Sequence, residues 1–316
     1  MIRTVLGDIP ADRLGATNYH EHLFQISPLL PGDELDDEDA SQAEVSLLRA
    51  SGFDAMVDAT PIGLGRRPAA AARISQHTGI QVVATTGRHR EAHYAHDHWV
   101  RAWDDGALLA RFVDDIERSM PAVDGPQHGG TAPTPEVGPV RAGMLKAGVD
   151  YWRISSFERQ TLEAVAGACA STGVAVMVHL EFCTAAHEVL DILERAGAPA
   201  HRVVLAHADR DPDPGLHVDL AARGAYLGYD GFARPRTRGD AELLNLTAAV
   251  VEAGAGNRIV LGGDVARRSR YISYGGMPGL GYLGERYLPR LRGLIGAAAV
   301  ERMLVENAAR LLDIPR

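Results

Sequence analysis

Three short apolar runs stand close together in the middle of the chain, AGMLKAG (142–148), VAVMVHLEF (174–182) and RVVLAHAD (202–209). Two longer segments separate them, ERQTLEAVAGACASTG (158–173) and AAHEVLDILERAG (185–197). Both longer segments have helical apolar spacing and end on glycine, as helices often do. This alternation of strand and helix predicts an α/β fold.

The same alternation extends over the whole chain. Five further strand candidates are GATNYHEHL (15–23), FDAMVDAT (53–60), IQVVATTG (80–87), GAYLGYDG (224–231) and RIVLGGD (258–264), with helical patterns at 40–52 and 240–254. Eight strands, most of them followed by a helix, predict a single (β/α)8 TIM-barrel domain over residues 1–316 with extended loops at its C-terminal face. A doubly wound open sheet is the alternative, but no G-x-G-x-x-G follows the first strand.

Two segments do not fit the repeat. The proline- and glycine-rich stretch 121–139 reads as a loop before the fourth strand rather than as a domain linker, because the alternation continues on both sides. The last helical pattern, AAAVERMLVENAARLL (297–312), has apolar spacing suited to packing beneath or across the barrel.

Composition limits the possible functions. The chain has 316 residues, 46% of them hydrophobic, and a net charge of −9, which argues against a nucleic-acid or anionic-membrane surface. No apolar run approaches the roughly 18 residues of a membrane-spanning helix, the N-terminal MIRTVLGDIP has no secretory apolar core, and two cysteines give no disulfide framework. We therefore expect a soluble cytoplasmic protein.

One residue of the apolar run 142–148 is chemically unusual. Lys146 is the only lysine among 32 basic residues, all the others being arginine. A guanidinium stays charged in proteins, whereas a buried ammonium can lose its proton and become a nucleophilic amine. An accident of composition is the alternative, but an unpaired buried ammonium would be costly. We therefore expect Lys146 to be a functional amine.

Potential metal ligands stand at the ends of four predicted strands. Alternation along a strand puts His20 and His22 on one face and Glu21 on the other. His179, His207 and Asp264 follow three later strands, and strand ends converge at one mouth of a barrel. Each has an ordinary alternative, a hydrogen-bonded structural histidine or a helix N-cap, but together they predict a metal site.

This ligand set explains the solitary lysine. Four neutral imidazoles and one carboxylate underbalance two divalent cations. A neutral amine at Lys146 can capture carbon dioxide, and the resulting carbamate, N6-carboxylysine, offers two anionic oxygens that can bridge two metals about 3.5–4 Å apart. We expect zinc, with manganese, cobalt or iron as alternatives.

The segments TNYHEHL, AGMLKAG, VMVHLEF, VLAHADRDPD and LGGDVARRSRYISYGGMPGLGYL resemble the phosphotriesterase-like family of the amidohydrolase superfamily, in particular its lactonase-type and phosphotriesterase homology members. The resemblance implies that His20, His22 and Asp264 hold the more buried metal. It also implies that His179 and His207 hold the more exposed metal and that carboxylated Lys146 bridges both.

The expected reaction is hydrolysis by a hydroxide that bridges the two metals, with Asp264 as the proton shuttle. We expect a lactone or ester substrate, possibly of a sugar acid or its phosphate. A phosphotriesterase or N-acyl amidase of the same family, a Schiff-base aldolase that uses the lysine, and a non-catalytic binding protein on this fold remain alternatives.

Substrate contacts are expected from the loops after the last two strands. Arg267 and Arg268 directly follow the metal-binding aspartate and suit an anionic small molecule. Arg234, Arg236 and Arg238 are interpreted as solvated loop charges. Four further residues complete the expected site: Tyr229 and Tyr271 as cavity walls, Glu181 as a sugar-hydroxyl acceptor, and Asp209 as an orienting group behind the ligands, with a helix cap as its alternative.

The segment GRHREAHYAHDHW (87–99) adds four histidines at positions 89, 93, 96 and 98. It lacks a nearby cysteine or a compact H-x3-H spacing, so a further metal site is disfavoured. A substrate lid or a subunit contact is favoured instead. We expect a homodimer.

Overall fold

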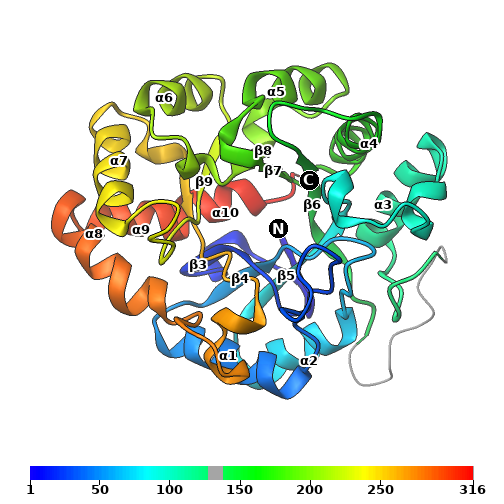
Figure 1. The fold of residues 1–316 in the computed structure, drawn as a ribbon, viewed down its shortest axis with the longest axis horizontal. Helices are drawn as coiled ribbons and strands as arrows, with labels where there is room; N and C mark the ends of the chain where they lie inside the picture. The colour runs from blue at the N-terminus through cyan, green and yellow to red at the C-terminus, as the bar shows by residue number, and fades with distance from the viewer. Residues whose placement is uncertain (127–137, 316) are drawn as a thin grey trace.

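The computed structural model of the protein describes residues 1–126 and 138–315. Eight parallel strands form a barrel in sequence order (Figure 1), namely β3 (Thr17–Glu21), β4 (Ala55–Asp58), β5 (Gln81–Gly87), β6 (Ala142–Val149), β7 (Val176–Leu180), β8 (Val203–Ala206), β9 (Tyr226–Tyr229) and β10 (Ile259–Leu261). Seven of them lie inside a segment predicted as a strand, and β6 extends one residue beyond its predicted segment, so the (β/α)8 prediction is confirmed. Most of the loop predicted at 121–139 lies outside the described residues.

The first and last strands meet through a small number of specific hydrogen bonds. The backbone N–H of Asp264 donates to the carbonyl oxygen of His20 at 2.9 Å. Behind it, Asn18 Oδ1 accepts from the backbone N–H of Gly263 at 3.2 Å, and Glu21 Oε2 accepts from that of Val265 at 3.0 Å. The seam of the barrel therefore fixes His20 and Asp264 against each other, although they are far apart in sequence.

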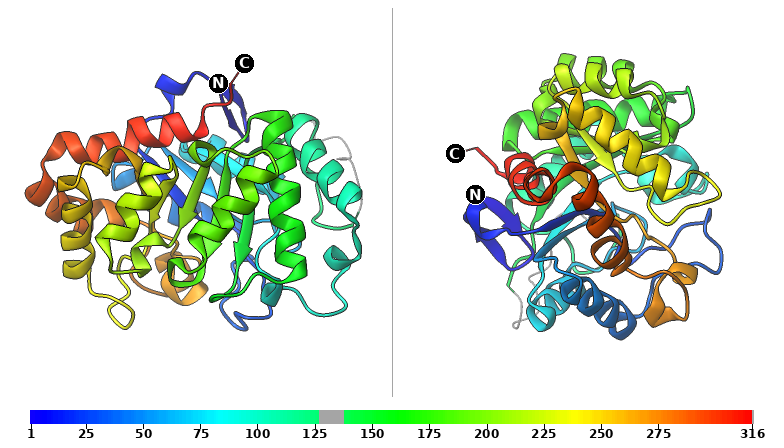
Figure 2. Two further views of the ribbon diagram at one scale, coloured as in Figure 1. Left: turned by 90° about the horizontal axis from the view of Figure 1, so that it is seen from above. Right: turned by 90° about the vertical axis from the view of Figure 1, so that its left-hand side faces the viewer.

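Helices surround the strands (Figures 1 and 2). They are α1 (Glu38–Ala50), α2 (Pro68–Thr78), α3 (Asp105–Glu117), α4 (Ser156–Thr172), α5 (Ala186–Arg195), α6 (Pro214–Ala222), α7 (Asp240–Glu252) and α8 (Leu288–Ile295). Local sequence sets several of their starts: Ser155 and Glu158 form a capping box at α4, and Asp213 caps α6 by accepting from the backbone N–H of Gly215. None of the helices in the described ranges is long and apolar enough to cross a membrane.

One end of the barrel is closed by the two chain termini (Figure 2). A hairpin of β1 (Ile2–Thr4) and β2 (Gly7–Ile9) lies at the amino-terminal ends of the barrel strands. There the backbone N–H of Val5 donates to the carbonyl oxygen of Val82, at the start of β5, at 2.8 Å. The terminal helical segment, α9 (Ala297–Glu301) through α10 (Asn307–Leu312), inserts its last leucines among interior residues. The last helix therefore packs beneath the barrel as predicted, whereas strands as short as those of the hairpin leave no periodic pattern in the sequence.

The barrel interior is filled by apolar side chains up to the level of Lys146. Period-two alternation along β6 turns Met144 and Lys146 to the inside. The apolar layer around Met144 includes Val57, Val83, Met177, Val204 and Val260. Because this layer is packed, polar chemistry is confined to the carboxyl ends of the strands, where barrel enzymes build their sites.

A buried charge network holds the end of β5. Asp115 of α3 accepts from Arg66 Nη2 at 2.8 Å, from Thr86 Oγ1 at 2.7 Å and from Arg111 Nε at 3.0 Å. Asp115→Ala should lower the free energy of unfolding by about 3–5 kcal/mol, because it removes the carboxylate from buried ion pairs with Arg66 and Arg111. Denaturant titration measures this. Asp114→Ala removes only a solvent-exposed pair with Arg118 and should cost under about 1 kcal/mol; equal losses would contradict the assignment.

Candidate metal centre and cavity

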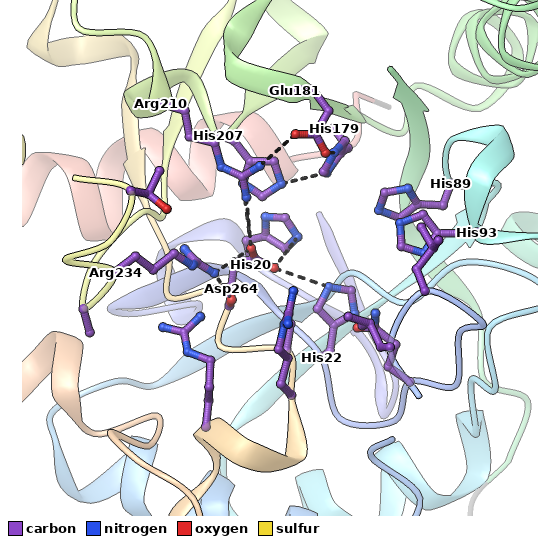
Figure 3. Close-up of a pocket in the computed structure, with 18 of the residues that line it drawn as sticks. His20, His22, His89, His93, His179, Glu181, His207, Arg210, Arg234 and Asp264 are labelled. Atoms are coloured by element: carbon purple, nitrogen blue, oxygen red, sulfur yellow. Dashed lines mark hydrogen bonds and ion pairs between the residues drawn. The ribbon is translucent and has the colours of Figure 1, made fainter. Parts of the chain in front are cut away.

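A cavity of about 770 Å³ opens at the carboxyl ends of the strands. The five histidine and aspartate ligands expected from the sequence all line it (Figure 3): His20, His22, His179, His207 and Asp264. They come from the ends of β3, β7, β8 and β10, so the folded chain brings together residues that span most of its length. Lys146 lies beneath them as the next inward side chain of β6.

The first group consists of His20, His22 and Asp264. Each histidine places Nε2 at 3.7 Å from Asp264 Oδ1. Their Nδ1 atoms are held from behind, that of His22 by Thr60 Oγ1 at 2.8 Å and that of His20 by Asp230 Oδ2 at 2.9 Å. Both rings therefore turn Nε2 toward one carboxylate oxygen, and the three ligand atoms can hold one cation.

The second group consists of His179 and His207, whose facing nitrogens, Nδ1 and Nε2 respectively, lie 2.8 Å apart. The opposite nitrogen of each ring contacts a carboxylate: His207 Nδ1 lies 2.6 Å from Asp230 Oδ1, and His179 Nε2 lies 3.0 Å from Glu181 Oε1. Two imidazoles whose outer nitrogens donate to carboxylates direct their lone pairs at one point, which suits a second cation.

Asp230 was missed by the sequence reasoning. It is fully buried at the end of β9 and accepts hydrogen bonds from His20, His207 and the hydroxyl of Tyr19. Burial alone would raise its pKa, but the contacts with His207 and His20 hold the pKa well below its usual range. Asp230 hydrogen-bonds the Nδ1 atoms of His20 and His207, and the Nε2 atoms of both rings therefore point away from it. In this way Asp230 orients two potential ligands. Its only signal in the sequence was a carboxylate at the end of a predicted strand.

Asp209 supports this arrangement from behind. Its Oδ2 accepts from the backbone N–H groups of Asp230 at 3.1 Å and Gly231 at 2.7 Å. Asp209 therefore fixes the backbone of the residue that orients His20 and His207. The neighbouring Asp213 instead caps α6, which is the alternative role expected from the sequence for this acidic segment.

Lys146 is fully buried and lies beneath the ligands, in contact with His20 of the first group. Its Nζ is 3.2 Å from His20 Nε2 and 3.1 Å from Met177 Sδ, and among the described residues no carboxylate is within ion-pair distance. Burial lowers its pKa to about 8. Gly87 makes room for this strand, since a Cβ there would lie 2.1 Å from the Lys146 carbonyl oxygen. The structure thus places a readily deprotonated amine beneath the ligands.

Burial also keeps the four imidazoles neutral. It is the main cause that lowers the pKa of His20, His22 and His179, and it lowers that of His207 to about 4. Metal binding requires unprotonated imidazole nitrogens. The donor set of neutral imidazoles, one ionised carboxylate and one amine therefore fits a divalent-metal centre near neutral pH.

The backbone is strained at two of the candidate ligands. His207 has φ of 63° and Asp264 has φ of 43°, the left-handed region that residues with a Cβ rarely adopt. Such strain is found mainly where the surroundings enforce a functional geometry. Here the seam hydrogen bond of Asp264 and the contact between His207 and Asp230 supply that enforcement.

Charged side chains complete the cavity wall. Arg234 is ion-paired to Asp264 at 2.8 Å, which corrects its interpretation as a solvated loop charge. Glu181 also lines the cavity, where Arg90 at 3.1 Å and Arg210 at 3.6 Å flank it. These pairs compensate three of the arginines. Arg236, Arg267 and Arg270 line the cavity as well.

Arg270 differs from the other cavity arginines. Its Nη2 is buried and has no hydrogen-bond partner within residues 1–126 and 138–315. Burial, and then the charge of Arg234, lowers its pKa to about 10, so the guanidinium remains charged at neutral pH. A buried, charged donor without an acceptor is costly unless a ligand supplies one.

Three expected substrate contacts lie elsewhere. The Tyr229 hydroxyl contacts His217 Nδ1 at 2.5 Å, and the Tyr271 hydroxyl donates to the carbonyl oxygen of His22 at 2.5 Å, so both pack behind the cavity. Arg268 donates to Glu34 O and to Asp36 Oδ1, away from the cavity. The contacts of Tyr271 and Arg268 join segments more than 200 residues apart, so position after Asp264 in the sequence did not indicate where these side chains lie.

The histidine-rich loop contributes to the cavity in part. His89 and His93 line it, whereas His96 is exposed and His98 caps a short helical turn by accepting from Val100 N. Among the described residues, no group of potential metal ligands includes a histidine of this loop.

The model of the phosphotriesterase family matches residues 1–312, which is nearly the whole chain. The chain belongs to the phosphotriesterase family. A phospho-furanose lactonase of Mycoplasmopsis synoviae is 28% identical over 325 residues, which cover 98% of this chain and 91% of that protein. An N-acetyltaurine hydrolase of Danio rerio is 26% identical, covering 98% and 97%. The crystal structure of a lactonase from Listeria monocytogenes matches with a TM-score of 0.88 at 29% identity, covering 100% and 99%.

In this phosphotriesterase-family chain, we expect Glu181 to affect how tightly a metal would be held by His179 and His207. Glu181→Gln removes the charge that accepts from His179 Nε2, so we expect about 10-fold weaker retention of one of two metals. Metal content after dialysis against graded chelator measures this without reference to activity. Glu188→Gln, at an exposed position of α5, is the control; identical retention in the two variants would contradict the role.

Proposed function

We propose that the protein is a metal-dependent hydrolase of lactones or esters that carry an anionic group, such as a sugar-acid lactone phosphate. One observation carries the proposal. The potential histidine and aspartate ligands, with Lys146 beneath them, share a cavity with Arg270, whose buried Nη2 has no acceptor in the described structure. The ligands suit hydrolysis, and the guanidinium suits a substrate phosphate or carboxylate.

The residues that would hold the metals follow from the two groups. His20, His22 and Asp264 would hold one ion, His179 and His207 the other, and the carbamate of Lys146 would bridge them. The carbamate forms when the neutral amine attacks carbon dioxide, making an N–C bond and releasing one proton. Two divalent cations held there would lower the pKa of a bound water and polarise a carbonyl oxygen.

The side chains around the proposed metal positions support a proton-transfer role for Asp264. Arg234 occupies Asp264 Oδ2 and favours the ionised carboxylate, so Asp264 can accept the proton of the attacking water and deliver it to the leaving oxygen. Arg210, 3.7 Å from Asp264 and 3.6 Å from Glu181, adds positive charge beside the reacting carbonyl. In a lactone the leaving oxygen stays attached to the product, so no separate leaving group departs.

The relatives support this substrate class. A phospho-furanose lactonase acts, by its name, on a lactone with a phosphate, the anion that Arg270 suits. An N-acetyltaurine hydrolase acts on an amide with a sulfonate, which the same guanidinium would also bind. Hydrolysis of an anionic N-acyl amide is therefore the second candidate.

A substrate panel on metal-loaded protein tests the proposal. It contains five-membered aldonolactones, their phosphates, N-acetyltaurine, other N-acyl amino acids and paraoxon. We expect the highest kcat/KM on the phosphorylated lactones. Activity on the amides alone would establish the second candidate instead. Borohydride trapping of a ketose on Lys146 would indicate an aldolase, and the absence of metal under metal-replete conditions would favour a binding protein.

A further inference from the structure

The cavity has two chemically different sides. Arg210 and Arg234 lie on one side of the metal-ligand histidines, and His89 and His93 lie on the other (Figure 3). The two loop histidines are in mutual contact, with ring centroids 3.8 Å apart, and the His89 ring is 4.6 Å from that of His179. Neither residue is needed to hold the metals or to move the proton in the proposed reaction.

His89 has a fixed hydrogen-bonding polarity. Its Nδ1 accepts from the backbone N–H of Arg90 at 2.8 Å. A nitrogen that accepts carries no proton, so the ring is neutral and its proton is on Nε2. That Nε2 has no partner within the described ranges, and His89 is buried against the cavity, so the N–H is available to a ligand beside His179.

His93 has an adaptable polarity. Its Nδ1 lies 2.9 Å from Ser27 Oγ, a hydroxyl that can either donate to the ring or accept from it. If the hydroxyl donates, His93 Nε2 is a donor; if it accepts, Nε2 is an acceptor. One fixed donor beside one adaptable group matches vicinal hydroxyls, each of which donates and accepts.

An apolar chain would be a poor fit to this side. Burying the His89 N–H against an alkyl group would leave a donor unsatisfied, which weakens binding. A second anion would find no uncompensated positive charge there, because His89 is neutral and the neighbouring Arg90 is ion-paired to Asp150 and Glu181. The wall therefore favours uncharged, oxygen-rich groups over fatty acyl chains.

We propose that His89 and His93 are specificity-determining residues that bind hydroxyl groups of the substrate, while its anionic group faces Arg270 on the other side. This inference rests on the proposed function and narrows it to polyhydroxylated anionic lactones. It also predicts that lactones with long acyl chains bind weakly.

The test measures binding of hydrolysis products to the metal-loaded protein by calorimetry. The probes are ribonate 5-phosphate, its 2-deoxy and 3-deoxy forms, and inorganic phosphate. The variants are His89→Phe, which removes the donor, His89→Gln, which keeps an N–H donor, and His93→Phe. Wild-type protein should bind ribonate 5-phosphate about 10-fold more tightly than at least one deoxy form. The preference should vanish in H89F or H93F and persist in H89Q, with inorganic phosphate bound equally by all.

The outcomes separate the two proposals. Retention of the hydroxyl preference in both phenylalanine variants, or no preference in the wild type, overturns the role of the histidines, even if the lactone is hydrolysed. A preference that depends on His89, found without hydrolysis of the corresponding lactone, upholds the binding role and overturns the proposed reaction. Failure of all three sugar acids to bind overturns the role as well. A general structural defect would instead weaken inorganic phosphate and sugar acids together.

Discussion

Lys146→Ala should lower kcat/KM on the preferred lactone by about a thousand-fold or more. Without the proposed bridging carbamate, two bound metals would lose their shared ligand, and the polarisation that they would provide contributes several kcal/mol, with about 1.4 kcal/mol for each tenfold in rate. Steady-state kinetics and metal content measured on the same sample check this. A short carboxylic acid with bicarbonate should restore part of both, because it refills the space with a carboxylate.

Two controls isolate the carbamate from the fold. Lys146→Met keeps the side-chain volume and removes the buried amine, so it should be inactive yet no less stable to denaturant than the wild type. The intact mass of wild-type peptides under mild conditions should show one added carbon dioxide. Because carbamate forms from the neutral amine and the pKa of Lys146 is about 8, that adduct should diminish as the pH falls below 8. Full activity of the unrescued alanine variant would refute the bridge.

Arg270→Met should lower kcat/KM on a phosphorylated lactone by about 100-fold or more. Losing one partner of a buried charge pair costs about 2–5 kcal/mol. On the unphosphorylated lactone the change should be small, since no anion faces the guanidinium. The comparison of the two substrates in one variant therefore reports on the anionic group rather than on the metals.

Arg268→Met is the matched control, because Arg268 follows the same strand but bonds Glu34 and Asp36 outside the cavity. In this variant kcat/KM should change by less than about twofold on both substrates, because an exposed ion pair contributes little. Equal losses on both substrates in R270M would show that Arg270 acts on the structure of the site and not on the anion.

The fold and the ligand set could be predicted from the sequence for a physical reason. Strand and helix periods are local, and in a parallel barrel every strand end reaches the same mouth. Hence His20, His179 and Asp264 converge whatever the details of packing. The lone lysine in an apolar strand needed only the difference between an amine and a guanidinium.

The loop residues could not be assigned in this way. Arg268 and its partner Asp36 are 232 residues apart, and nothing local to either predicts the contact that turns Arg268 out of the cavity. Arg234 is drawn inward by Asp264, also from a separate loop. A long flexible side chain takes its direction from its partners, so sequence position alone misplaced both arginines.

The sequence by itself determined the barrel, the candidate ligands and the special status of Lys146, because each depends on periodicity or on the intrinsic chemistry of one side chain. Only the tertiary structure decided that Asp230 orients two histidines, that Arg270 Nη2 is buried without an acceptor among the described residues, and that His89 presents an N–H to the cavity. Those properties depend on hydrogen bonds and distances between separate segments, which exist only once the seam and loops of the barrel have closed.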